Sequence, residues 1–136
     1  MAALASLHEA QRPYQPFGSA EEIFYSKDRI LVASGPAGTG KSRAILEKLH
    51  YLLCKYERLR VLIVRATRRA LTESALYTFE EHVLADGDWD RYIRQGPSRD
   101  HRNTYRYPNA SMIRVAGFDD KSADRIMSTE WDFIFI

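Results

Sequence analysis

Eight consecutive residues, Gly35 to Ser42, constrain this chain more than any other feature of its sequence. They read Gly-Pro-Ala-Gly-Thr-Gly-Lys-Ser and match the pattern GxxxxGK[ST] in full. Glycines in such a stretch let the backbone curl so that successive N–H groups point inward, and a following helix adds the positive end of its dipole. The pattern therefore predicts a loop that holds the phosphates of a nucleotide, between a strand and a helix.

The residues on either side of the loop favour this interpretation. Ile30 to Ser34 form an apolar run without alternation, which is typical of a strand buried on both faces. From Lys41 to Tyr56 the apolar residues recur at helical spacing. A dinucleotide-binding GxGxxG loop does not fit, because Arg43 stands where the third glycine would be.

The motif gives its residues distinct roles. We expect Lys41 to reach the β- and γ-phosphates of ATP as a catalytic residue, and the Ser42 hydroxyl to ligate Mg²⁺. ATP and Mg²⁺ are therefore the predicted cofactors. The predicted nucleotide-binding residues of the loop are Gly35, Pro36, Ala37, Gly38, Thr39, Gly40, Lys41 and Ser42.

The rest of the pattern is typical of an α/β protein with a mainly parallel central sheet flanked by helices. Val61 to Val64 is a second candidate for a buried strand, and Thr67 is a plausible N-cap for a helix over about 68–84. Two short strands, Tyr105 to Tyr107 and Ser111 to Val115, form a predicted hairpin, and Trp131 to Ile136 is a third apolar strand.

Composition excludes several classes of protein. The 136 residues suffice for one domain, 45% of them are apolar, and the net charge is only +2. No apolar run approaches the roughly 20 residues that a membrane span needs, so we expect no membrane partner and a cytoplasmic location. The single cysteine, Cys54, excludes an internal disulfide, and the four histidines show no zinc-ligand spacing.

Beyond the loop, the chain resembles the N-terminal ATPase domain of the large terminase subunit, the DNA-packaging motor of tailed bacteriophages. The loop GPAGTGKS is the specific element of the resemblance. Three weaker stretches follow in the same order and spacing: VLIVRATRRALTESA, YPNASMIRVAGFDD and WDFIFI. Together they cover about residues 14–136, nearly the whole chain.

The resemblance implies a P-loop NTPase fold and a motor that powers the packaging of double-stranded DNA into a capsid. The implied partners are double-stranded DNA, the portal protein, the small terminase subunit and further copies in a homo-oligomeric ring, all in the host-cell cytoplasm. Residues 1–28 would be a lead-in and residues 29–136 an ATPase domain that is incomplete at its C-terminus. The family's acidic pair should follow Ile136, so we expect these residues alone not to hydrolyse ATP appreciably.

Two further residues take roles from the resemblance. Gln15, in Tyr14-Gln15-Pro16, is similar to the family's adenine-contacting segment; the alternative is an exposed lead-in glutamine. Arg125 lies where a catalytic arginine finger could act on a neighbouring subunit; the alternative is a surface arginine among nearby aspartates. Many terminases carry an arginine inside the phosphate loop, and Ala37 occupies that neighbourhood here.

Two other groups of arginines could either bind a ligand or serve the structure alone. The first group follows the second predicted strand. It lies either at the edge where parallel sheets bind ligands or on a solvated helix end. The second is interleaved with tyrosines and could form a nucleic-acid face, although a solvated loop is the stronger interpretation. The first group is Arg65, Arg68 and Arg69; the second is Arg91, Tyr92, Arg94, Arg99, Arg102, Tyr105, Arg106 and Tyr107.

Two alternatives to a terminase follow from the same residues. A helicase-like or phosphate-starvation-type P-loop ATPase would carry a similar GPAGTGK loop. A nucleotide- or DNA-binding fragment without catalysis would also fit, because the sequence shows no catalytic base.

Overall fold

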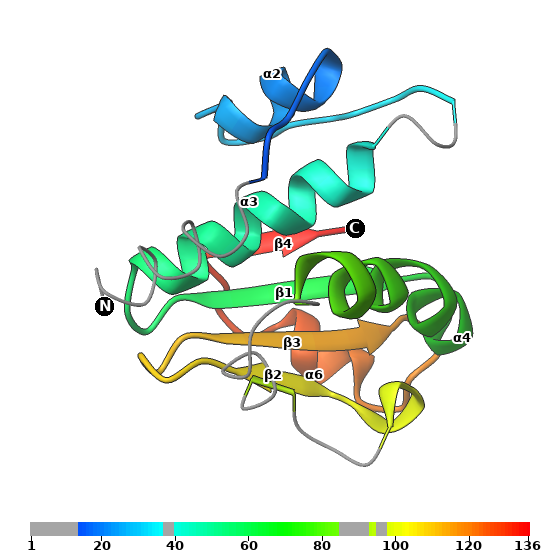
Figure 1. Cartoon of the computed structure of the whole chain (residues 1–136). Helices are drawn as coiled ribbons and strands as arrows, with labels where there is room; N and C mark the ends of the chain where they lie inside the picture. The colour runs from blue at the N-terminus through cyan, green and yellow to red at the C-terminus, as the bar shows by residue number, and fades with distance from the viewer. Residues whose placement is uncertain (1–13, 37–39, 85–92, 95–97) are drawn as a thin grey trace.

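Residues 14–36, 40–84, 93–94 and 98–136 are described by a computed structural model. It is an α/β structure whose four-stranded sheet has the order β2-β3-β1-β4, with helices packed against it (Figure 1). Strand β1 pairs in parallel with both β3 and β4, and β2 pairs antiparallel with β3. The strands are β1 (Arg60–Arg65), β2 (Thr104–Arg106), β3 (Met112–Gly117) and β4 (Phe133–Phe135). The structure confirms three predictions: the α/β class, the strand around 61–64 and the hairpin.

Strand β1 is the centre of the sheet because it is apolar on both faces. Val61 and Ile63 belong to the main core, together with the apolar side of the helix that follows the phosphate loop. Leu62 and Val64 face the other way and contact Ile126 in a smaller cluster. A strand buried on both faces reads as a continuous apolar run, as it does here.

The long helix α3 (Lys41–Lys55) begins with the last two residues of the predicted phosphate loop and confirms the helix predicted there. Its side chains Leu46, Leu49 and Leu53 are buried in the main core. The short helix α2 (Ser19–Tyr25) packs against α3, and the Lys48 ammonium donates hydrogen bonds to the carbonyl oxygens of Ile23 and Ser26 at its carboxyl end. Lysine there satisfies carbonyls that the helix cannot pair itself.

A second helical run follows β1 and also agrees with the sequence. The Thr67 hydroxyl accepts a hydrogen bond from the Ala70 amide at 3.1 Å, so Thr67 is the N-cap as predicted. The run begins as α4 (Arg68–Leu71) and continues through two π-helical segments, Thr72–Leu76 and Phe79–Val83. Two shorter helices complete the described elements: a 3-10 turn, Arg99–His101, and α6 (Ala123–Met127).

The predicted buried strand at Ile30 to Ser34 is wrong for this structure. Residues 31–36 are extended but form no strand, and the side chains of Ile30 and Val32 are each 84% exposed. The physical reason is that no described strand lies beside them, since the sheet ends at β4. The last predicted strand forms as β4, but Phe133 and Ile134 are 40% and 49% exposed instead of buried.

No described helix combines the length and apolar character that crossing a membrane would require.

A close backbone contact joins β3 to the start of α4. A Cβ atom on Gly117 would lie 2.4 Å from the Arg68 amide nitrogen and 2.8 Å from the Thr67 carbonyl carbon. The same Arg68 amide donates a hydrogen bond to the Asp119 carboxylate at 2.9 Å, and the Gly117 amide donates to Asp120 at 2.8 Å. Glycine is therefore required where the carboxyl end of β3 meets the helix N-terminus.

We predict that Gly117→Ala destabilises the chain by about 1–3 kcal/mol, because backbone atoms must move to accept the methyl group. Urea unfolding followed by circular dichroism measures the change. Ala110→Gly is the opposite case: Ala110 has a φ of 69°, which glycine adopts without strain, so this variant should be at least as stable as the parent. A Gly117→Ala variant with unchanged stability would show that the contact is looser than the structure has it.

Candidate phosphate-binding site

The orientation of α3 places the phosphate-loop motif at a defined edge of the sheet. The helix runs antiparallel to β1, so its N-terminus lies at the side where β1, β3 and β4 have their carboxyl ends (Figure 1). Ligands of open parallel sheets bind at this edge, outside the carboxyl ends of the strands. The structure therefore brings Lys41 and Ser42 to an edge where ligand binding is common.

The described part of the loop has a geometry that depends on glycine. Gly40 is the N-cap of α3 with a φ of 79°, a left-handed conformation that side chains disfavour. The Lys41 side chain turns back across the loop, where its Nζ donates to the carbonyl oxygens of Gly35 at 2.8 Å and Pro36 at 2.7 Å. Ser42 is exposed in the first turn of α3. The predicted loop residues Ala37, Gly38 and Thr39 lie outside the described residues.

The N-termini of α3 and α4 differ in a way that bears on anion binding. The cap of α3 is Gly40, which has no side chain to accept from a backbone amide, and the first turn of α3 contains no acidic residue. The start of α4, in contrast, is closed by the Thr67 hydroxyl and the Asp119 carboxylate. A helix N-terminus attracts anions through its dipole and its unpaired N–H groups, so α3 offers an anion the better site.

A hollow beside Lys41 adds space for a larger ligand. It encloses about 580 Å³ and is bordered by α2 and by the extended residues that lead into the loop. Its polar lining includes Ser19, Glu22, Ser34 and Lys41. The sequence motif did not identify the α2 residues, because nothing in the local pattern of α2 indicates that it folds back beside the loop.

The segment of Gln15 lies against the start of α3. The Tyr14 ring packs 5.6 Å from Phe24, and the Arg43 guanidinium lies 5.4 Å from the centre of the Tyr14 ring. Burial raises the pKa of Tyr14, and the nearby Glu47 carboxylate adds to the increase. Gln15 itself is exposed. The segment thus lies near the phosphate loop, and the adenine-contacting role of Gln15 stays a prediction.

Arg125 lies on the other side of the sheet from α3. It is an exposed residue of α6, whose Ile126 packs against Leu62 and Val64, whereas α3 packs on the opposite face. Of the nearby aspartates, Asp119 accepts from the Arg68 amide and Asp120 from the Gly117 amide. The structure therefore does not bring Arg125 and Lys41 together within one chain.

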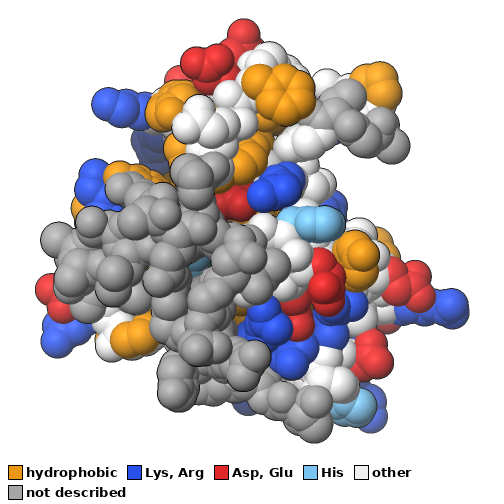
Figure 2. All heavy atoms as spheres, in the orientation of Figure 1, with side chains coloured by type: hydrophobic (Ala, Val, Ile, Leu, Met, Phe, Trp, Pro, Cys, Tyr) orange, Lys and Arg blue, Asp and Glu red, His pale blue; other side chains and the backbone are white. Residues whose placement is uncertain are grey.

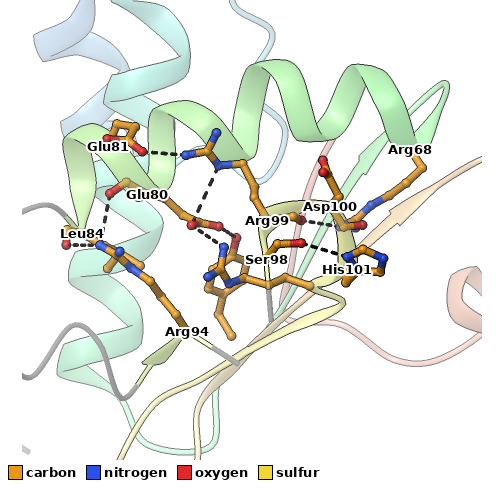
Figure 3. Close-up of polar contacts among 11 residues, drawn as sticks. Arg68, Glu80, Glu81, Leu84, Arg94, Ser98, Arg99, Asp100 and His101 are labelled. Carbon is orange, nitrogen blue, oxygen red and sulfur yellow. Dashed lines mark hydrogen bonds and ion pairs between the residues drawn. The ribbon is translucent and has the colours of Figure 1, made fainter. Parts of the chain in front are cut away.

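Arg94, Arg99 and Arg102 of the second group contact the helix after β1 around the buried Glu80 carboxylate (Figure 3), whereas Arg106 is exposed. The Glu80 carboxylate, on a side chain that is 4% exposed, accepts hydrogen bonds from Arg102 Nη1 and from the Tyr105 hydroxyl, both at 2.6 Å. Arg99 Nη2 pairs with Glu81 at 2.6 Å, and Arg94 Nη2 donates to the Leu84 carbonyl oxygen at 2.7 Å. Burial beside Glu80 raises the pKa of Tyr105, which keeps its hydroxyl a donor.

These contacts show that part of the proposed nucleic-acid face has an internal role. Tyr105 and Tyr107 are buried, so neither can stack on a base, while Arg91 and Tyr92 lie outside the described residues.

The arginines of the first group also make contacts within the chain. Arg68 Nη2 donates to the carbonyl oxygens of Arg99 and Asp100, and Arg69 pairs with Glu73 at 3.0 Å. Arg65, at the carboxyl end of β1, lies over the Phe135 ring at 5.0 Å. Arg68 therefore holds the 99–100 backbone against the start of α4.

No group of three or more histidine, cysteine or acidic side chains that could hold a metal ion occurs within residues 14–36, 40–84, 93–94 and 98–136. Neither a scan against protein-family models nor searches of curated proteins and of solved structures found a match to this chain.

We predict that Glu80→Gln destabilises the chain by about 2–4 kcal/mol, because it leaves the Arg102 guanidinium, whose side chain is only 14% exposed, without its counter-charge. Glu81→Gln is the matched control. It removes the same charge one residue further on, from a side chain that is 51% exposed, and should cost less than about 1 kcal/mol. Chemical unfolding of both variants compares the two costs; equal costs would show that the Glu80 network contributes no more than a surface pair.

Proposed function

We propose that this chain binds ATP with Mg²⁺ through Gly35–Ser42, as the P-loop ATPase domain of a DNA-packaging terminase large subunit. The observation that carries the nucleotide-binding part is the complete motif at the N-terminus of α3, at the carboxyl edge of a parallel sheet. An uncapped helix N-terminus, a lysine turned onto the loop and a neighbouring hollow together suit a polyphosphate.

The donor set of the loop fits a nucleoside triphosphate. The Lys41 ammonium already binds two loop carbonyl oxygens, so it is held over the loop, and phosphate oxygens would compete for it as stronger, charged acceptors. The exposed Ser42 hydroxyl would contribute one ligand to Mg²⁺. When bound, Mg²⁺ would neutralise charge on the phosphates, and the chain's own residues would bind and orient them.

The terminase assignment rests on the sequence resemblance, and with it the proposed partners. These are double-stranded DNA, the portal protein, the small terminase subunit and other copies of the chain in a ring. The observed α/β sheet supports the α/β class of the P-loop NTPase fold that the resemblance implies, although the strand expected before the loop is not part of it. The position of Arg125 favours a role in trans over a role in its own site, because α6 and α3 lie on opposite faces of the sheet.

We predict that Lys41→Ala reduces ATP affinity at least tenfold, because a charge-assisted hydrogen bond to phosphate contributes on the order of 1.5–3 kcal/mol. Isothermal titration calorimetry with Mg²⁺ and ATP measures the affinity. Lys55→Ala, at the far end of the same helix, is the matched control and should bind as the parent does. Parent-like affinity of the Lys41→Ala variant would contradict the proposal.

We predict that Arg125→Ala leaves ATP binding by the isolated chain unchanged, because Arg125 does not share a face of the sheet with the phosphate loop. Equilibrium binding of a fluorescent ATP analogue, with a monomer shown by sedimentation, measures this. A several-fold loss of affinity in the monomer would place Arg125 in its own chain's site and would exclude a role that operates only between subunits.

A further inference from the structure

Arg65 ends the central strand on the face of the sheet that carries α3. Side chains of β1 alternate: Val61 and Ile63 lie in the main core with α3, whereas Leu62 lies on the other face. This alternation puts Arg65 on the face of Val61 and Ile63. Its contact agrees, because the Arg65 guanidinium lies 5.0 Å from the centre of the Phe135 ring, which packs against the main core. Arg65 and the start of α3 thus share one face and one edge of the sheet (Figure 1).

The Arg65 side chain leans across the sheet toward the side of the phosphate loop. Phe135, whose ring it covers, belongs to β4, and β4 pairs with β1. Residues 29–33, which lead into Gly35, line a cavity together with β4, so β4 lies between β1 and the segment that carries the loop (Figure 1). A guanidinium that starts from β1 and lies over a ring of β4 has therefore crossed part of the distance to the loop.

The Arg65 guanidinium has no hydrogen-bond or ionic partner among the described residues. The residue is partly buried, and its Nε is buried without an acceptor. Arg68, Arg94, Arg99 and Arg102 each contain one such nitrogen, but each also donates through another nitrogen of its guanidinium. A partly buried charge without a counter-charge is costly, and a bound anion would remove that cost.

The position of the hollow beside Lys41 indicates which phosphate Arg65 would meet. The hollow is bordered by α2 and by residues 31–34, and neither β1 nor Phe135 lines it. A nucleoside in the hollow would lead its phosphate chain over Lys41, away from α2 and toward the carboxyl ends of β4 and β1. The terminal phosphate would then be the part of the ligand on the side of Arg65. A guanidinium suits this position, because its planar fork matches the oxygens of a phosphate.

We propose that Arg65 binds the terminal phosphate of the nucleoside triphosphate in its own chain and makes the site prefer a triphosphate to a diphosphate. This role rests on the proposed function. It is separate from the role in trans of Arg125, which lies on α6 at the opposite face of the sheet. Stacking on Phe135 holds the guanidinium in place beforehand, so little side-chain freedom is lost on binding.

The test compares Arg65→Gln with Arg60→Gln, a matched control at the other end of β1. Arg60 also lies over an aromatic ring, that of Trp131 at 4.8 Å, so each variant removes one charge and one cation–π contact. Isothermal titration calorimetry with Mg²⁺ measures the affinity of each variant for ATP and for ADP. Arg65→Gln should weaken ATP binding about tenfold or more and ADP binding less than about twofold. Arg60→Gln should bind both nucleotides as the parent does.

A second variant, Arg65→Lys, keeps the proposal testable if circular dichroism shows that Arg65→Gln does not fold. Lysine retains the charge but lacks the planar fork of the guanidinium. Arg65→Lys should therefore lose several-fold in ATP affinity, less than Arg65→Gln loses, again with little change for ADP.

The possible outcomes separate this role from the proposed function. Parent-like ATP binding by the folded Arg65 variants, or equal losses for ATP and ADP, would overturn the role of Arg65. If Lys41→Ala still weakens ATP binding in that case, the proposed nucleotide site stands without Arg65. A parent chain that binds neither nucleotide would overturn the proposed function and the role of Arg65 with it.

Discussion

The packing of α3 across the sheet is the interaction on which the rest of this structure depends. Leu46, Leu49 and Leu53 attach the helix to the face that Val61 and Ile63 of β1 present. Burying each such leucine contributes on the order of 2 kcal/mol, so these contacts fix the direction of the helix. That direction places Gly40, Lys41 and Ser42 at the carboxyl edge of the strands. The candidate site is therefore a consequence of core packing. In the space-filling view, hydrophobic and charged side chains both lie on the visible face of the molecule (Figure 2).

Most elements could be predicted because their cause is local. Helical spacing after Lys41, the Thr67 cap and the continuous apolar run at 61–64 each depend on residues close in sequence, and the structure contains all three. The segment Ile30 to Ser34 has an equally strong local pattern, yet it forms no strand. A strand needs a partner strand, and local sequence cannot show whether one lies alongside.

The features of the candidate site also divide into those that local sequence predicts and those that it does not. The motif predicts the loop, because the requirement for glycine, lysine and serine at fixed spacing is local. It could not reveal that Lys41 bridges the carbonyl oxygens of Gly35 and Pro36, or that α2 borders the neighbouring hollow. Nor could composition show that Glu80 would pair with Arg102, 22 residues away in the sequence, which gives Arg102 an internal role.

The most direct test of the central claim is a titration of isotope-labelled chain with Mg²⁺ and ATP, followed by backbone amide chemical shifts. Two helix N-termini lie at the same edge of the sheet, and they differ in whether side chains close them. The account predicts saturable shifts concentrated at Gly40–Arg43, with little change at 67–70. Shifts centred on 67–70, or no saturable change at Gly40–Arg43, would contradict it.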